Sequence, residues 1–183
     1  MKKVVLLGDS IRLIGYGTKV PELLGDDFDV WQPSENCKFA KYTLRCIHDW
    51  KNNIRGADII HWNNGLWDTC RLYDGEPFTS VTEYCDTVVK IAKVLLSYTK
   101  KLVFATTTPV NPKKKDQSND DIRAYNEAVL PALKVMGVII NDLHSLVSEN
   151  IDGYICEDNI HLSPLGIEVC AKQVANVIKK LAD

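Results

Sequence analysis

Short apolar runs alternate along the chain with longer segments in which apolar residues recur every three or four positions. The first run, Val4 to Leu7, has no polar interruption and contains two β-branched residues. Such a run is typical of a strand that is covered on both faces, as in the middle of a parallel sheet. Four further runs are predicted to be strands, at 28–31, 57–62, 102–105 and 138–140.

The segments between the strands have the spacing of amphipathic helices. Residues 11–25 predict a loop followed by a short helix, and longer helices are predicted at 42–53, 80–98 and 122–136. A last helix begins with Ser163 as its N-cap and Pro164 in its first turn. Strands that alternate with helices in this way predict an α/β protein, a three-layer α/β/α sandwich around a sheet of about five parallel strands.

Length and charge limit the classes of protein to which the chain can belong. Its 183 residues, 45% of them hydrophobic, suit a single domain that covers residues 1–183. The net charge is -2 and no basic stripe is present, so nucleic acid is not expected as a partner. The apolar run after the two N-terminal lysines is too short for a signal peptide or a membrane span. We therefore expect a cytoplasmic protein with no membrane partner, and its oligomeric state stays open.

Six cysteines are spread over the chain, at positions 37, 46, 70, 85, 156 and 170. None belongs to a CxxC motif, and no secretory segment accompanies them. We therefore expect reduced and mostly buried thiols and no metal site. Disulfides or a structural zinc site are the alternatives.

Two short polar turns carry the candidate chemistry. Gly8-Asp9-Ser10 ends the first strand, and ligands of open α/β sheets bind beyond the carboxyl ends of the strands. Asp158 and His161 lie three residues apart in a turn before the last helix. Each turn alone is an ordinary structural feature, but together they supply a serine hydroxyl, an imidazole base and an orienting carboxylate, the parts of a nucleophilic triad. The remaining histidines are predicted to be structural: His48, His61 and His144.

The order Ser, Asp, His, with the last two in one turn, resembles the SGNH or GDSL hydrolase superfamily. Gly8-Asp9-Ser10-Ile11 is similar to that family's first block, with Ile11 in place of the usual leucine. The stretch 158–166 is similar to its fifth block, DxxHLxxxG, and Thr107-Thr108-Pro109 resembles the Thr-Pro that follows its fourth strand. The resemblance implies a flavodoxin-like sandwich with five parallel strands, in agreement with the pattern above.

The middle blocks depart from the family's pattern. Its third block is GxND, whose asparagine helps to bind the oxyanion, but Gly65-Leu66-Trp67-Asp68 has a tryptophan in that place. Asn63 and Asn64 precede this glycine, and successive strand residues point to opposite faces, so we expect only Asn63 to face the oxyanion. The second block has no clear match, and Asn36 is the best candidate for its donor. The backbone N–H of Ser10 would complete the oxyanion hole.

These residues predict a serine esterase that needs no cofactor and acts on a small-molecule ester. The family resemblance implies a small acyl group, such as acetyl on a carbohydrate. We expect Asp9, Asn64 and Trp67 to contact the substrate. Trp62, Trp67 and Tyr73 are placed either to stack on a sugar or to fill the core.

Three alternatives stay open at this point. A lysophospholipase or thioesterase would need a long apolar groove. A flavodoxin-like binding module without catalysis would have no need for the complete set of Ser, Asp and His. A cysteine nucleophile such as Cys37 is a further variant.

Overall fold

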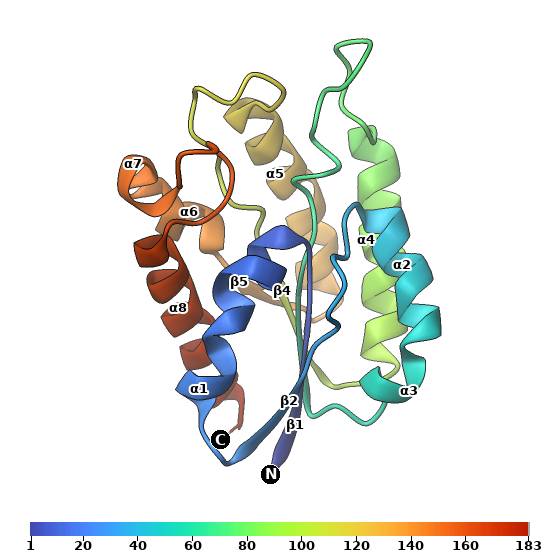
Figure 1. The fold of residues 1–183 in the computed structure, drawn as a ribbon. Helices are drawn as coiled ribbons and strands as arrows, with labels where there is room; N and C mark the ends of the chain where they lie inside the picture. The colour runs from blue at the N-terminus through green and yellow to red at the C-terminus, as the bar shows by residue number, and fades with distance from the viewer. Residues whose placement is uncertain (183) are drawn as a thin grey trace.

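The computed structural model describes residues 1–182 and contains a five-stranded, all-parallel sheet (Figure 1). Its strand order is β2-β1-β3-β4-β5, so the chain leaves β1 toward one edge and returns on the other side of β1 to form β3. All five predicted strands are confirmed, and all four pairings are parallel. The strands are β1 Lys2–Leu7, β2 Phe28–Trp31, β3 Ile59–Asn63, β4 Lys101–Ala105 and β5 Ile139–Asn141.

Both faces of the sheet are covered, as the unbroken apolar run of β1 predicts. Val4 and Leu6 point into one hydrophobic core, whereas Val5 and Leu7 point into another. Figure 1 shows the resulting three layers, with α1 and α8 on one side of the sheet and α2 and α4 on the other. The helices of the first face are α1 Val20–Leu24, α6 Leu143–Ser148 and α8 Pro164–Ala182. Those of the second face are α2 Ala40–Asp49, α4 Val81–Leu96 and α5 Asn119–Val135.

Residues 11–25 were predicted to be a loop followed by a short helix; the short helix is confirmed as α1, but the predicted loop is helical. It forms a π-helix, η1 (Ile11–Gly15), and a 3-10 helix, η2 (Tyr16–Thr18), before α1 begins. Two backbone N–H groups of η1 donate to the carbonyl of Asp9, at 3.1 and 2.9 Å, so the helical turn starts directly after the candidate nucleophile. Glycines in this segment obscure the helix in a sequence pattern, because glycine lowers helix propensity.

Capping side chains explain where two helices begin. Helix α5 starts at Asn119, three residues before the prediction, because Ser118 Oγ accepts a hydrogen bond from Asp120 N at 3.1 Å. The predicted N-cap of α8 is confirmed, since Gly166 N donates to Ser163 Oγ at 3.0 Å. The sequence pattern merged α3 (Lys51–Ile54) with α2 into one predicted helix. It did not predict α6 or α7 (Ile151–Tyr154).

The cysteines and histidines largely follow their predictions. All six cysteines are free, but only half are buried. His48 lies in α2, His61 in β3 and His144 in α6. Between residues 1 and 182, no helix combines the length and the apolar composition that crossing a bilayer requires.

Candidate active site

The carboxyl ends of the strands bring the candidate residues into one region of the molecule. Ser10 follows β1, Asn36 lies in the loop after β2, and Asn63 ends β3. Because β2 and β3 lie on opposite sides of β1, the connections from these strands diverge at the end of β1. Ligands of open α/β sheets bind at such a topological switch point. The strand order therefore places Ser10 where a substrate is expected.

Gly8 allows neighbouring segments to approach the nucleophile turn, residues 8–10. A Cβ on residue 8 would lie 2.0 Å from Oδ1 of Asn63, far closer than real Cβ contacts. Cys37 N donates to the Gly8 carbonyl at 3.1 Å, and Gly8 N donates to Cys37 Sγ at 3.3 Å. Cys37 thus has a structural role, and burial raises the pKa of its thiol to about 11. This pKa disfavours a thiolate, so Cys37 is a poor candidate for the nucleophile.

Asp9 supports the nucleophile turn from inside the protein. Its side chain is fully buried, and Oδ1 accepts hydrogen bonds from Ile11 N at 2.9 Å and Asn63 Nδ2 at 2.8 Å. Burial raises the pKa of Asp9 to about 6, although both hydrogen bonds oppose this shift. The prediction that Asp9 contacts the substrate is wrong, because no part of the residue is accessible.

The two asparagines at the end of β3 both bond to buried partners. Asn63 is 4% exposed, and while its Nδ2 donates to Asp9, its Oδ1 accepts from Tyr16 Oη at 2.8 Å. Asn64 is fully buried and donates from Nδ2 to Thr43 Oγ1 at 2.8 Å. The full burial of Asn64 contradicts its predicted substrate contact. The oxyanion role of Asn63 stays a prediction, since its Nδ2 carries a second N–H.

Asn36 has a side-chain amide that one backbone hydrogen bond holds in place. The residue is partly exposed, and its Oδ1 accepts a hydrogen bond from Lys38 N at 2.7 Å. This bond orients the amide, and its Nδ2 donates to none of residues 1–182. Lys38 has a φ of 48°, so the loop turns sharply directly after Asn36 and Cys37. The role of Asn36 stays a prediction.

A buried arginine joins the nucleophile turn to the loop that carries Asn36, and no sequence pattern pointed to it. Arg12 is fully buried, and its guanidinium donates to the carbonyl of Gly8 at 3.1 Å. It also donates to the carbonyls of Pro33 and Glu35, both at 2.7 Å. Arg12 thus holds two segments of the candidate oxyanion hole together. Its partners lie up to 23 residues away, beyond the reach of local periodicity.

Asp68 supports the same loop from a second direction. Its carboxylate is fully buried and accepts hydrogen bonds from Ala40 N, at 3.2 and 3.1 Å, at the start of α2. Burial raises the pKa of Asp68 to about 7, while a hydrogen bond from Thr79 opposes this shift. Asp68 therefore acts as a cap of α2, in the position where the family's GxND block has its aspartate.

Asp158 and His161 form a paired carboxylate and imidazole in the turn before α8. His161 Nδ1 is 2.5 Å from Asp158 Oδ2, and Asp158 Oδ1 accepts from the backbone N–H of His161 at 2.9 Å. Cys156 Sγ donates to the same Oδ1 at 3.0 Å, a contact that the sequence did not suggest. Partial burial would raise the pKa of Asp158, but its hydrogen bonds, first of all from the His161 side chain, hold this pKa well below its usual range. An ionised Asp158 fixes the proton on Nδ1 and leaves Nε2 as the base.

Packing brings this turn to the nucleophile turn. Leu162, directly after His161, contacts η1: a Cβ on Gly15 would lie 3.3 Å from Leu162 Cδ1 and 4.0 Å from the carbonyl oxygen of Ser10. Burial is the main influence on the pKa of Asp9, but the charge of His161 is close enough to lower it. Ser10 is partly exposed. Among residues 1–182, neither Ser10 Oγ nor His161 Nε2 has a hydrogen-bond partner, and the two atoms are not bonded to each other.

The three aromatic residues with predicted roles in sugar stacking have different environments. Trp62 is fully buried and packs on Phe104, with ring centroids 4.7 Å apart, so it belongs to the core. Tyr73 is 99% exposed, and it does not line the pocket that Trp67 lines. Trp67 is 42% exposed, and its substrate contact stays a prediction.

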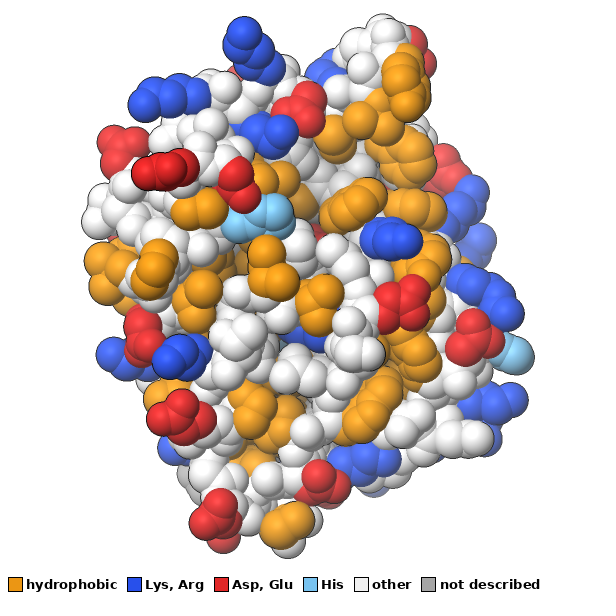
Figure 2. All heavy atoms as spheres, viewed as in Figure 1, with side chains coloured by type: hydrophobic (Ala, Val, Ile, Leu, Met, Phe, Trp, Pro, Cys, Tyr) orange, Lys and Arg blue, Asp and Glu red, His pale blue; other side chains and the backbone are white. Residues whose placement is uncertain are grey.

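An apolar pocket of about 250 Å³ lies beside the paired carboxylate and imidazole. In Figure 2, hydrophobic side chains gather over the loops beyond the carboxyl ends of the strands, chiefly above α2 and α4. The pocket is lined by Phe39, Leu66, Trp67, Cys70, Leu72, Phe78, Gln117 and Ile160.

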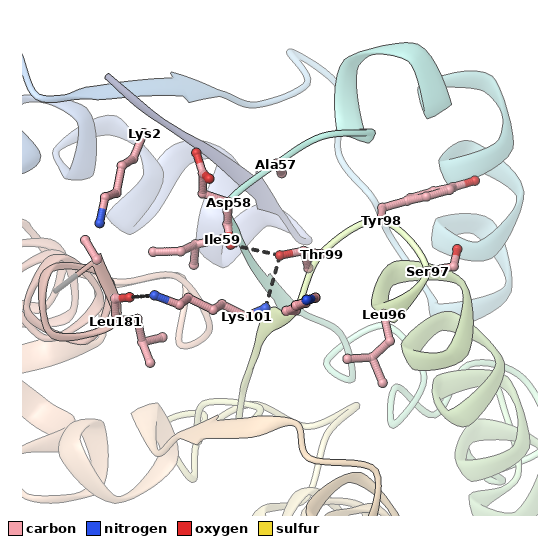
Figure 3. Close-up of a pocket in the computed structure, with 12 residues that line it drawn as sticks. Lys2, Ala57, Asp58, Ile59, Leu96, Ser97, Tyr98, Thr99, Lys101 and Leu181 are labelled. Carbon is pink, nitrogen blue, oxygen red and sulfur yellow. Dashed lines mark hydrogen bonds between the residues drawn. The ribbon is translucent and has the colours of Figure 1, made fainter.

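A larger pocket, of about 510 Å³, lies at the opposite end of the sheet (Figure 3). The starts of β1, β3 and β4 and the end of α8 line it. Its polar groups are bonded to each other: Thr99 Oγ1 donates to the Asp58 carbonyl at 2.9 Å, and Lys101 donates to the Leu181 carbonyl. Ligand sites of α/β sheets lie at the carboxyl ends of the strands, so this pocket receives no role in the candidate site.

No family model matches the sequence, and no curated protein matches it. Solved structures do match. A lipase/acylhydrolase from Enterococcus faecalis has a TM-score of 0.82 at 16% identity, over 98% of this chain and 96% of its own. An acetylxylan esterase from Geobacillus stearothermophilus has a TM-score of 0.78 at 17% identity, over 97% and 94%. A GDSL-like lipase from Bacteroides thetaiotaomicron has a TM-score of 0.76 at 13% identity, over 98% and 88%.

The chain therefore has the fold of the SGNH/GDSL hydrolases, as its sequence motifs led us to expect. The five-stranded parallel sheet between two helical layers is the common feature. Identities of 13% to 17% establish the fold alone. The activity has to be argued from the site.

Proposed function

We propose that the chain is a carboxylic ester hydrolase with Ser10 as its nucleophile. His161 Nε2 takes the proton of Ser10 Oγ as this oxygen attacks the ester carbonyl carbon, and Asp158 stabilises the imidazolium that forms. The N–H of Ser10 and the Asn36 amide bind the oxyanion. The ester C–O bond then breaks, and His161 gives its proton to the departing alcohol. Water, activated by His161, finally cleaves the acyl-serine ester and releases the acid.

The hydrogen bond between Asp158 and His161 is the observation that carries this proposal. The carboxylate is bonded to Nδ1, so the opposite nitrogen is free to act as a base. The turn that holds the pair packs on the helix that follows Ser10. A binding module without catalysis would have no need for an ionised carboxylate behind an imidazole at the switch point of the sheet.

Acetyl is the acyl group that we propose, and an acetylated carbohydrate is the first substrate to test. Two of the proteins with similar structures are acetylxylan esterases: one is from Geobacillus stearothermophilus, and the other is AlAXEase. These names describe those proteins, and they support a test of the same substrate class here.

A lysophospholipase or thioesterase is the second candidate, and the apolar pocket favours it. A long acyl chain needs a hydrophobic surface beside the nucleophile, and the pocket beside His161 offers such a surface. Its volume of about 250 Å³ is below the range of about 300 to 1,000 Å³ that is usual for drug-sized ligands. A long lipid chain would therefore extend beyond it.

The test is hydrolysis of p-nitrophenyl esters of increasing acyl length, with Ser10→Ala as the variant. We expect turnover of acetyl and propionyl esters, and Ser10→Ala should lower kcat by about 10⁴- to 10⁶-fold while circular dichroism shows an unchanged fold. Ser97→Ala, which removes an exposed hydroxyl at the other end of the sheet, is the matched control. Near wild-type turnover by Ser10→Ala would refute the mechanism, and rates that rise toward long chains would favour the second candidate.

A further inference from the structure

The turn of Asp158 and His161 is called the acid-base turn below. The apolar pocket beside it has no part in the proposed mechanism. Four segments of the chain build it: Phe39 before α2, the loop after β3 from Leu66 to Phe78, Gln117 before α5, and Ile160. These segments are far apart in sequence and meet only in the folded chain. Ile160, which directly precedes His161, is the lining residue that links the pocket to the turn of Asp158 and His161.

The walls of this pocket offer almost nothing to a polar ligand. Gln117 has the only amide among the lining side chains, and its Nε2 donates to the carbonyl of Leu66. The thiol of Cys70 is 3.6 Å from Asp116 Oδ2. A sugar hydroxyl that entered this space would lose its water and find few partners, which is unfavourable. A hydrocarbon group would instead gain from leaving water.

The walls are also held in place by contacts at both ends of the loop. Phe39 and Phe78 meet edge to face, with ring centroids 5.1 Å apart. Arg71 forms a salt bridge with Asp121 at 2.8 Å, and its backbone N–H donates to the carbonyl of Asp116 at 2.7 Å. The loop is thus tied to the segment that contains Gln117. The pocket therefore exists before a ligand binds, as is usual for small-molecule sites.

The position of the pocket beside the general acid suggests which half of the ester it takes. In the proposed mechanism, His161 gives its proton to the oxygen of the departing alcohol, so the alcohol lies on the His161 side of the carbonyl carbon. Ile160 forms the wall nearest to that residue in sequence. An acetyl group needs space for only a methyl group, so the acyl half has no use for about 250 Å³ of apolar volume.

We propose that this pocket binds an apolar group on the alcohol side of the ester, either an alkyl chain or a single aromatic ring. This inference rests on the proposed esterase function and keeps its short acyl group, but it replaces the carbohydrate by an apolar alcohol as the preferred leaving group. The preferred substrates are short-acyl esters of apolar alcohols. Acetates of an unsubstituted sugar are weaker substrates, because the pocket cannot replace the hydrogen bonds of their hydroxyls.

The first experiment compares two series of esters on the intact protein. Linear acetates from methyl to hexyl acetate lengthen the alcohol, and methyl esters from acetate to hexanoate lengthen the acyl group. We expect kcat/KM to rise about fourfold per methylene in the first series until the pocket is filled, since a buried CH₂ contributes about 0.8 kcal/mol. The second series should show no such rise. Equal values for methyl and hexyl acetate, or a rise in the acyl series alone, would overturn the proposal.

Variants of the pocket wall provide a second test. Phe78→Ala removes a half-exposed ring from the wall and should lower the ratio of kcat/KM for hexyl acetate over methyl acetate by about tenfold. Leu72→Ala, also half exposed, is the second wall variant. Tyr73→Ala is the matched control, because Tyr73 lies on the same loop but outside the wall and should leave the ratio unchanged. A ratio that stays at its wild-type value in both wall variants would contradict the proposal.

A binding measurement separates failure of the pocket from failure of the esterase function. We expect 1-hexanol to bind the Ser10→Ala variant and to shift the amide NMR signals of residues 66–79, although this variant cannot turn over an ester. Absence of these shifts would overturn the pocket proposal whatever the activity. Binding of 1-hexanol together with ester hydrolysis that Ser10→Ala does not impair would instead refute the proposed function alone.

Discussion

The two turns that form the candidate site are held in opposite ways. The nucleophile turn is fixed from below by buried bonds to distant segments, since Arg12 reaches Glu35, 23 residues away, and Asn63 reaches Asp9, 54 residues away. In the turn of Asp158 and His161, the side-chain bonds of the pair join residues at most three positions apart, and both side chains are partly exposed. Its backbone has one bond to a distant loop, from Asn111 N to the Asn159 carbonyl at 3.0 Å. The nucleophile turn therefore depends on buried side chains from distant segments, whereas the pairing of Asp158 with His161 is local.

The two aspartates show what this difference means for charge. Burial dominates at Asp9 and raises its pKa to about 6, so its ionised form is unfavourable in the fold. At Asp158, hydrogen bonds from the His161 side chain and from the backbone outweigh burial and hold the pKa well below the usual range. Changes to the buried side chains that support the nucleophile turn should therefore affect stability and activity together, whereas changes to Asp158 and His161 should affect mainly activity.

The largest effects on activity are expected in the acid-base turn. His161→Ala removes the base and should lower kcat by about 10⁴- to 10⁶-fold, with little change in the free energy of unfolding. Asp158→Asn keeps the base but loses its orienting charge, so its loss of kcat should be smaller, about 10²- to 10⁴-fold. Steady-state kinetics on one acetate ester measure both. A harmless His161→Ala would contradict the assignment of the base.

Arg12→Met tests the tertiary support of the nucleophile turn. The change leaves three carbonyl groups without their charged donor, and we expect a loss of about 3 to 5 kcal/mol in the free energy of unfolding, measured by urea denaturation. Activity should also fall at temperatures where the variant is folded, because Arg12 no longer holds the loop that carries Asn36. Arg12→Lys keeps the charge and should be less damaging in both respects. Unchanged stability of Arg12→Met would show that the bonds of Arg12 contribute nothing net.

Asn36→Ala separates the oxyanion role from structural support. Loss of one oxyanion donor should lower kcat by about 10²- to 10³-fold, or about 2.7 to 4 kcal/mol of transition-state stabilisation, with little change in KM. Asn63→Ala is the comparison: it removes bonds to Asp9 and Tyr16, so it should lower the free energy of unfolding by about 1 to 3 kcal/mol. A loss of kcat in Asn63→Ala without loss of stability would favour the oxyanion role of Asn63.

The pH dependence of stability compares the two aspartates most directly, and its expected effect is the smallest. The folded state raises the pKa of Asp9 from 3.8 to about 6, so Asp9 favours folding below pH 4 and loses this contribution as the pH rises through 6. The unfolding free energy of Asp9→Asn minus that of the wild type should therefore increase by about 2 kcal/mol between pH 4 and pH 7. Thermal or urea unfolding at several pH values measures this difference.

Asp158→Asn is the control for this measurement, because the pKa shift of Asp158 has the opposite sign to that of Asp9. The pKa of Asp158 is lowered in the fold, so its charge stabilises the folded state above the unfolded pKa and ceases to do so as the pH falls below about 4. The difference between Asp158→Asn and the wild type should be nearly constant from pH 5 to pH 7. A flat difference for Asp9→Asn as well would mean that burial does not disfavour the Asp9 charge.

The sequence by itself determined the strands, the main helices and the acid-base turn, because each depends on residues close together in the chain. Unbroken apolar runs identify buried strands, and the DxxH spacing places a carboxylate and an imidazole within bonding distance in one turn. Ser10 could be located for the same reason, since it directly follows such a run. The fold class followed from the alternation of these elements.

Only the tertiary structure decided what surrounds these residues. Asn63 and Asn64 could not be assigned from strand alternation, because both bond to buried partners on other segments: Asp9 in the turn after β1 and Thr43 in α2. Arg12 has no local signal, since its meaning lies in carbonyl groups of a distant loop. The apolar pocket likewise exists only where four separate segments meet. Hydrogen bonds and packing between distant segments depend on how the chain is folded, so local sequence patterns do not contain them.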